Sequence, residues 1–439
     1  MKKLFEDFDA VSLASWTEKI TADLKGKPLE VLNSNPEMDI EIKAYHHKDS
    51  NTKSSHLGIS ALGDWKIRRS YSKSEYNSNI LSDLNEGIDA VGFTYSDNLE
   101  KQSKDILFDH IQSDIKFTDL SQTSGAKIPA NAHINCDIFG RAAKRGRWPQ
   151  NRGNFSAFVN EFPNNKSIWT DGSAFGNAGA TTIQELAITL AQVNDYVQPM
   201  TESGHTLEEI HSKLLIELSV NENYFVNIAK MRVIRLLVAG LFKGHQENFK
   251  GDPITLYAST SVRHLAKNDT NNNLLRQTTQ AMSAVLGGCD VLTIQADKSS
   301  DEEQDVINQR MAKNIQLVLK EEAYLNVVKD PSEGSYYLNA LTEQILTKSW
   351  DLFKEIEKLG GFCVALETNF IQNKIEENQE YMIAQLNESE KTFLGINKHQ
   401  SKLEDWKDIE SVETSNEATD FKAIKPFRLE SYFKNTQTV

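Results

Sequence analysis

Short apolar runs alternate with helical segments over most of this chain, and this alternation limits the folds that it can adopt. The runs that predict strands are Trp65–Tyr71, Ala90–Phe93, His133–Ile138, Ser167–Thr170, Ile254–Ser259, Val291–Gln295, Tyr324–Val328 and Thr392–Ile396. The helices predicted between them include Thr182–Val193, Glu222–Phe242, Asn272–Leu286, Glu302–Leu319 and Ala340–Leu359. Such alternation implies parallel strands joined by crossover helices. A doubly wound sheet and a closed (β/α)8 barrel both fit, and the alternation alone does not choose between them.

Composition excludes several classes of protein. A chain of 439 residues suits one large domain with appendages, or two to three domains. The net charge of -14 argues against general nucleic-acid binding, which needs a basic surface. No apolar run approaches the length needed to cross a bilayer, and the first residues contain no apolar signal core. Three widely separated cysteines, Cys136, Cys289 and Cys363, suit reduced thiols, so we expect a cytoplasmic protein.

The first 50 residues are predicted to form an arm outside the main body. Ser12 is a plausible N-cap for a helix that runs to about Lys25. Trp16, Ile20 and Leu24 share one face of this helix because they are four residues apart. Two interpretations stay open: the apolar face packs on its own domain, or it packs on another chain.

The end of the chain differs in composition from the middle. Residues 399–424 are polar and acidic, which predicts a flexible linker. A short apolar piece follows, Pro426–Leu429, and then Tyr432 and Phe433. The predicted domains are therefore an arm at 1–50, a main body at 51–398, and a linker with a tail at 399–439.

A glycine-rich segment, Asp171–Thr182, lies between a predicted strand and a predicted helix. In a barrel it would lie at the carboxyl end of the strands, where binding sites are built. It could hold a small molecule or a phosphate at the helix N-terminus, or it could be a tight turn that needs small residues. The turn is the favoured interpretation. No Walker A, G-x-G-x-x-G, H-E-x-x-H or C-x-x-C motif is present, and the pair His46-His47 has no nearby Cys, Asp or Glu in ligand spacing, so no metal site is predicted.

Several long segments also match one known family in the same order along the chain. They are Asp64–Ser70, Asp171–Thr182, Ile254–Tyr257, Gly287–Thr293, Arg310–Glu322, Asp330–Tyr337 and Thr392–Lys398. Together they resemble the methylmalonyl-CoA mutases, which rearrange a carbon skeleton with adenosylcobalamin. The arm resembles the N-terminal arm of that family's small subunits. The resemblance runs from Leu4 to Phe433, and it implies a (β/α)8 barrel with an N-terminal helical arm and a short C-terminal tail.

The resemblance implies reactive groups on the barrel strands that this sequence lacks. The family's essential tyrosine corresponds to Ser70, and its thioester-binding arginine to Gly63. The arginine that holds the substrate carboxylate corresponds to Tyr257, and the histidine that bonds the substrate carbonyl to Thr293. A tyrosine cannot imitate the bidentate, permanently charged arginine.

The mid-barrel loop shows the same loss. Catalytic relatives place an aromatic residue, a histidine and a glutamine where this chain has Ser173, Ala174 and Gly176. None of these can supply the missing imidazole or carboxamide hydrogen bond. We therefore predict no catalytic, cofactor-binding or metal-binding residues in this chain.

The family's cobalamin signature, Asp-x-His-x-x-Gly, is absent, and the chain stops about where that domain would begin. The resemblance thus implies a non-catalytic small subunit that binds no cobalamin itself. It implies a heterodimer with a homologous catalytic large subunit, which would hold the adenosylcobalamin. Two alternatives are an active barrel that uses a separately encoded cobalamin domain, and a repurposed scaffold with no mutase partner.

One basic cluster has no place in this picture. It contains Arg141, Lys144, Arg145, Arg147 and Arg152 around Trp148, inside an acidic protein. It is either a solvated loop or a contact for an acidic partner surface or a coenzyme A phosphate.

Overall fold

We describe a computed structural model of the chain. The structure describes residues 11–50, 64–71, 77–96, 99, 105–106, 108–117, 129, 131–148, 167–267, 270–296, 302–399 and 419–433. Eight parallel strands form one sheet in the order β6-β5-β4-β3-β10-β9-β8-β7, which confirms the predicted (β/α)8 barrel. The strands are β3 (Lys66–Tyr71), β4 (Ala90–Thr94), β5 (Gln112–Lys116), β6 (Ala132–Asn135), β7 (Ile168–Asp171), β8 (Leu214–Val220), β9 (Thr255–Thr260) and β10 (Val291–Thr293).

The barrel closes through β10, which pairs with both β9 and the first strand, β3. Between β6 and β7 the backbone ladder is replaced by one side chain. The Ser167 hydroxyl lies 2.9 Å from both the amide nitrogen and the carbonyl oxygen of Ile134, accepting from the first and donating to the second. A hydroxyl can do both because it carries a donor and acceptor lone pairs.

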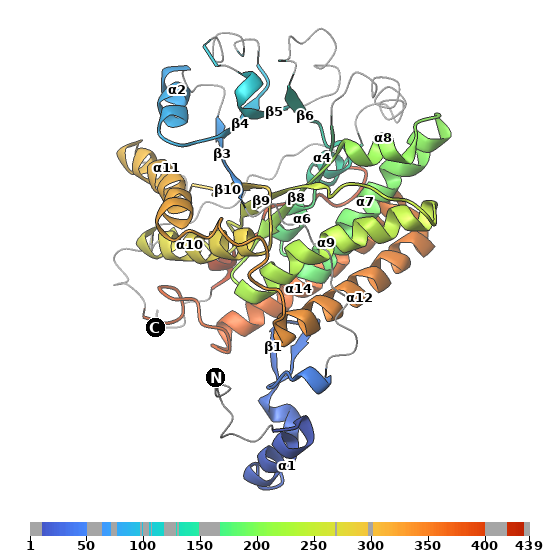
Figure 1. Ribbon diagram of the computed structural model, residues 1–439, viewed down its shortest axis with the longest axis vertical. Coiled ribbons are helices and arrows are strands. Elements are labelled where there is room, and N and C mark those ends of the chain that lie inside the picture. The colour runs from blue at the N-terminus through green and yellow to red at the C-terminus, as the bar shows by residue number, and fades with distance from the viewer. Residues whose placement is uncertain are drawn as a thin grey trace, which may run out of the picture.

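Helices surround the barrel and a further group of helices packs outside it (Figure 1). The crossover helices are α2 (Asn77–Asn85), α4 (Ile138–Arg145), α6 (Ser173–Asn177), α7 (Thr182–Glu202), α8 (Leu207–Ser212), α9 (Tyr224–His245), α10 (Thr270–Leu286) and α11 (Glu302–Leu317). After the barrel come α12 (Tyr336–Leu359), α13 (Gly361–Glu367) and α14 (Phe370–Asn387), and α12 packs across α7 and α9. None of the helices in the described part of the chain is long and apolar enough to span a bilayer.

Two predicted strands are wrong. Tyr324–Val328 follows a π-helical turn (Val318–Glu322) and contains a left-handed residue, Tyr324, with φ 53°. Tyr324, Val327 and Val328 are exposed, so this apolar run has no sheet to join. Thr392–Ile396 is a turn around Gly395, with only an isolated bridge from Leu394 to Lys398.

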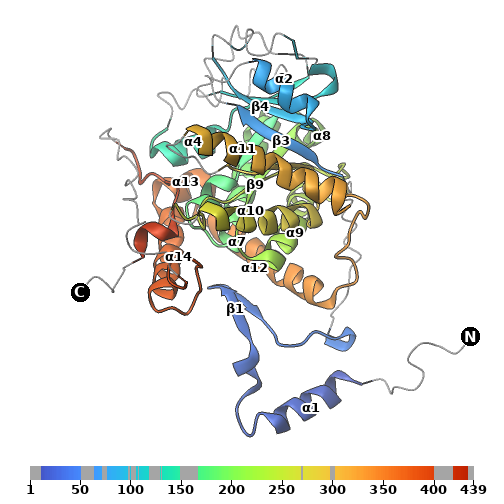
Figure 2. The same cartoon turned by 90° about the vertical axis from the view of Figure 1, so that its left-hand side faces the viewer.

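The N-terminal arm has two parts that behave differently. Helix α1 (Leu13–Asp23) begins at Ser12, whose hydroxyl accepts a hydrogen bond from the Ser15 amide, as predicted. It has no buried residue and stands away from the barrel in both views (Figures 1 and 2). Its only aromatic side chain, Trp16, stacks on Tyr45 with ring centroids 4.4 Å apart. The apolar face of α1 is therefore not part of the barrel's core.

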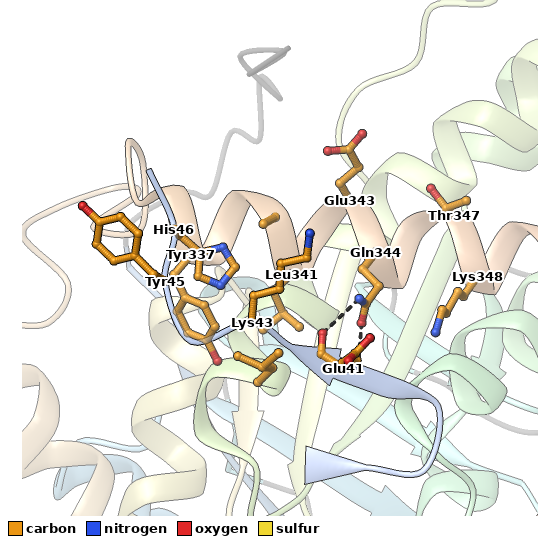
Figure 3. Close-up of a pocket in the computed structure, with 12 residues that line it drawn as sticks. Glu41, Lys43, Tyr45, His46, Tyr337, Leu341, Glu343, Gln344, Thr347 and Lys348 are labelled. Carbon is orange, nitrogen blue, oxygen red and sulfur yellow. Dashed lines mark hydrogen bonds between the residues drawn. The ribbon is translucent and has the colours of Figure 1, made fainter. Parts of the chain in front are cut away.

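The second part is a hairpin, β1 (Ser34–Glu37) with β2 (Ile40–Ile42), and it is anchored to the barrel helices. The Glu37 carboxylate accepts hydrogen bonds from the Thr182 amide (2.6 Å) and hydroxyl (3.0 Å) at the start of α7. On α12, the Gln344 side chain accepts from the Glu41 amide and donates to its carbonyl, at 3.1 and 3.0 Å (Figure 3). A hollow of about 380 Å³ stays open between the hairpin and α12.

Asp39 makes the docking of this hairpin sensitive to pH. Burial, together with the charge of Glu37, raises its pKa from 3.8 to about 6, although the Thr181 hydroxyl donates to it at 2.6 Å. A raised carboxyl pKa opposes docking above pH 6, and the penalty disappears as the pH falls toward 4. We expect Asp39→Asn to stabilise the protein at pH 7.5 by about 1–2 kcal/mol and to make little difference at pH 4.5. Thermal unfolding at both pH values checks this, with the exposed Glu30→Gln as control; equal gains at both pH values would contradict it.

Candidate functional site

Of the six vestigial positions predicted from the sequence, the five that the structure describes do not come together as one site. Gly63 lies outside the described residues. Ser70 and Thr293 lie at the carboxyl ends of neighbouring strands, β3 and β10, while Tyr257 lies nearer the amino ends, within β9. Ala174 and Gly176 lie in the short helix α6.

Arg68 connects Ser70 with Thr293, and no sequence motif had pointed to it. Its guanidinium donates to both carboxylate oxygens of Asp114, at 2.6 and 2.8 Å. It also donates to the hydroxyls of Ser70 and Thr293, both at 2.9 Å. A Cβ atom at Gly92 on β4 would collide with this guanidinium, so only glycine fits there. Burial alone would lower the Arg68 pKa, but the Asp114 charge and hydrogen bonds hold it above its usual value.

Below this ion pair, two aromatic rings fill the amino end of the barrel. Tyr257 and Trp169 are buried with ring centroids 4.6 Å apart, inside a cluster with Ala90, Leu215 and Val291. The Tyr257 hydroxyl accepts a hydrogen bond from the Gln112 side chain at 2.7 Å. Burial, with the Asp114 charge, raises the Tyr257 pKa above its usual range. A hollow of about 580 Å³ at this end is lined by Gln112 and other residues of the strand starts. The interior of the barrel around Tyr257 and Trp169 is therefore filled by the protein's own side chains.

The carboxyl ends of β6, β7 and β8 bring acidic groups together. Asp171 accepts from Lys144 at 2.6 Å and from the Ser173 hydroxyl at 2.5 Å. Burial would raise the Asp171 pKa, but these partners lower it to about 2. Burial and the charge of Asp171 raise the pKa of the neighbouring Glu217. Lys144 and Ser173 therefore keep Asp171 ionised, and it is not free to act as a general acid or base near neutral pH.

The basic cluster is divided by the fold. Arg141 donates to the backbone carbonyls of Asp137 and Phe117, both at 2.9 Å, and Lys144 points at Asp171. Arg145 is exposed, and Arg152 lies outside the described residues. Two of the predicted basic side chains are thus committed to intramolecular contacts.

The glycine-rich segment Asp171–Thr182 is buried under α14, which favours the turn interpretation. Gly179 has φ 106°, which favours glycine, and a Cβ atom there would lie 2.8 Å from the side chain of Gln379. Its carbonyl accepts from Asn378 at 2.6 Å. A Cβ atom at Gly176 would collide with the side chains of Ser219 and Glu185, so a glutamine there would require these two side chains to move.

The side chains of His46 and His47 contact different partners. His46 lies against the Tyr337 ring, and His47 lies 3.2 Å from the Asp49 carboxylate. Within the part of the chain that the structure describes, no group of three or more potential ligands could hold a metal ion.

These features define a (β/α)8 barrel whose interior is occupied by its own side chains. The methylmalonyl-CoA mutase family model matches residues 151–437. The chain is 29% identical over 438 residues to the methylmalonyl-CoA mutase small subunit of Porphyromonas gingivalis, an alignment that covers 90% of this chain and 71% of that subunit. The chain belongs to the methylmalonyl-CoA mutase family.

Longer relatives match a smaller part of the chain. The methylmalonyl-CoA mutase of Rhizobium meliloti is 32% identical over 266 residues, which is 60% of this chain and 37% of that enzyme. The large subunit of the P. gingivalis mutase is 31% identical over 254 residues, or 58% of this chain and 36% of that subunit. The matched regions thus span little more than a third of these longer proteins.

Proposed function

We propose that this chain is the non-catalytic small subunit of a heterodimeric, adenosylcobalamin-dependent methylmalonyl-CoA mutase, and that it stabilises a homologous catalytic large subunit in the cytoplasm. The complex would interconvert methylmalonyl-CoA and succinyl-CoA. The small and large subunits of P. gingivalis, both similar to this chain, support a two-chain enzyme.

The packed barrel interior is the observation that carries this proposal. Arg68 donates to Asp114, Ser70 and Thr293, so its guanidinium is already satisfied without a substrate. Tyr257 and Trp169 fill the layer below. Removing even one preorganised donor from an active site typically slows catalysis about 100- to 1000-fold, and here several are replaced.

His264 is one histidine that this fold makes unsuited to ligate cobalt. Cobalt ligation would need an accessible imidazole nitrogen. His264, in the loop after β9, is buried, with its Nδ1 atom 2.8 Å from the Glu222 carboxylate. Burial lowers its pKa to about 4 although Glu222 opposes that shift. Together with the lack of an Asp-x-His-x-x-Gly signature in the sequence, this supports our proposal that the partner subunit holds the adenosylcobalamin.

The two alternatives predict different partners. An active barrel with a separate cobalamin domain should copurify with a small cobalamin-binding protein. A repurposed scaffold should copurify with neither that protein nor a mutase chain. Purification of the native complex distinguishes both from the proposed function, which predicts a larger homologous chain.

We expect the purified chain to show less than about a thousandth of the turnover of the assembled complex with methylmalonyl-CoA and adenosylcobalamin. Thr293→His and Tyr257→Arg should not restore activity, because each returns a single group to a set that acts as a unit. A coupled assay of succinyl-CoA formation, run on the chain alone and with a large subunit added, provides the measurement. Thr293→Val is the control for folding. Turnover by the chain alone would overturn the proposal.

A further inference from the structure

Residues 419–433 return to the barrel and lie across the carboxyl-end side of its strands. The Asp420 amide donates to the Gly146 carbonyl at 2.8 Å, beyond β6, and the Phe427 amide donates to the Asn177 carbonyl at 2.8 Å, beyond β7. The Leu429 amide donates to the Arg263 carbonyl at 3.1 Å, beyond β9. The segment therefore connects the ends of α4 and α6 with the loop that follows β9. The prediction that the flexible linker extends to residue 424 is wrong for 419–424.

Four apolar side chains hold this segment: Phe421, Ile424, Phe427 and Leu429 are all buried. At one end, the Phe421 ring lies 5.6 Å from the Trp148 ring, whose indole nitrogen donates to Glu367 at 2.8 Å. At the other end, Phe427 and Leu429 join an apolar cluster with Ala266, Met382, Leu386, Phe393 and Ile396. Sequence composition hid these anchors because they are spaced among polar residues.

The surface that receives the segment fits it closely. Gly146 ends α4 with φ 72°, and a Cβ atom there would lie 2.7 Å from the Phe421 carbonyl oxygen. Glu430 is 2% exposed, and its carboxylate accepts from the Lys267 amide at 2.8 Å. A buried carboxylate needs such a partner, so the docked position is specified by polar as well as apolar contacts.

We propose that residues 419–433 are a peptide-like strap on the carboxyl-end side of the barrel, and that the strap excludes any other peptide from the ends of α4 and α6 and from the loop after β9. Barrels of this architecture build their binding sites from the loops at this face. Here those loops bond to the chain's own end. The surface beneath the strap is thus an interaction surface for an extended peptide with apolar anchors. In this protein the chain's own residues 419–433 occupy it. This inference does not depend on the proposed function.

The test uses the full chain with a protease site placed between residues 400 and 418. After cleavage, we expect the fragment 419–439 to stay bound during size-exclusion chromatography. In the double variant Phe421→Ala/Phe427→Ala, the dissociation constant of the fragment should rise at least about 100-fold, since both anchors lose their buried contacts. Ser431→Ala, on the exposed side of the same strap, should behave like the parent protein. Immediate release of the parent fragment, or retention that ignores the anchors, would overturn the proposal.

Closure of the face has its own measurement, in case the double variant fails to fold. Once the parent fragment is cleaved and diluted away, amides in residues 177–180 and 261–267 should exchange with deuterium at least about tenfold faster. Amides of α2, which the strap does not contact, serve as the internal reference. Unchanged exchange in the two loops after release of the fragment would show that the strap does not cover them.

Discussion

Lys230→Ala is expected to destabilise the protein by about 3–5 kcal/mol, because it leaves a buried carboxylate without its cation. Lys230 on α9 and Glu185 on α7 are both almost fully buried, and their charged atoms lie 2.8 Å apart. Glu185 also accepts from the amide and hydroxyl of Ser219 on β8, at 2.7 and 2.9 Å. The pair therefore connects two helices to a strand of the barrel.

Chemical denaturation of the parent protein, Lys230→Ala, Glu185→Gln and the double variant Lys230→Met/Glu185→Gln measures this effect. The double variant should recover much of the lost stability, because it leaves no unpaired charge. Lys19→Ala removes an exposed ion pair with Asp23 and should change stability by less than about 1 kcal/mol. A loss at Lys230 no larger than at Lys19 would contradict the buried-pair argument.

Removal of α1 should weaken assembly with the large subunit while it leaves the barrel folded. The apolar face of α1 carries Leu13, Trp16, Ile20 and Leu24, all partly exposed. An aromatic anchor at an interface typically contributes about 2 kcal/mol or more, so Trp16→Ala with Leu24→Ala should raise the dissociation constant at least about 30-fold. This prediction rests on the proposed function.

The structure sharpens the design of that experiment. Deletion of residues 1–28 leaves the hairpin and its contacts to Thr182 and Gln344 in place. The melting temperature of the isolated chain should therefore stay nearly unchanged, and Glu18→Ala, on the exposed side of α1, should bind the partner normally. If the deletion instead unfolds the barrel and leaves affinity intact, the helix is part of this chain's own core.

The alternation of strands and helices predicted most of the barrel, and the exceptions have physical reasons. Strand β5 contains Ser113 and Asp114, which are both buried, and Asp114 pairs with Arg68; a polar run of this kind does not look like a strand. Strand β8, Leu214–Val220, does carry an apolar signal and could have been found. Tyr324–Val328 has the composition of a strand, yet its neighbours leave it exposed.

The candidate site was predictable only in part. Comparison of motifs identified Ser70, Tyr257 and Thr293 as positions without the expected groups. It could not show what fills the space, because Arg68 and its partner Asp114 are 46 residues apart. Likewise, Gly176 is small for a reason that lies on other elements, at Ser219 and Glu185.

The way in which α12 contacts the hairpin has a consequence for solubility. An unpaired strand edge is a template on which other chains can add, and β2 carries such an edge. Its outward-facing backbone groups are the amide and carbonyl of Glu41, and the carbonyl of Asp39 lies just before the strand. They are taken by the side chains of Lys348 and Gln344. Two side chains of one helix thus make the hydrogen bonds that a neighbouring strand would otherwise make. A hairpin beside an exposed apolar helix is thereby protected from indiscriminate β-sheet aggregation.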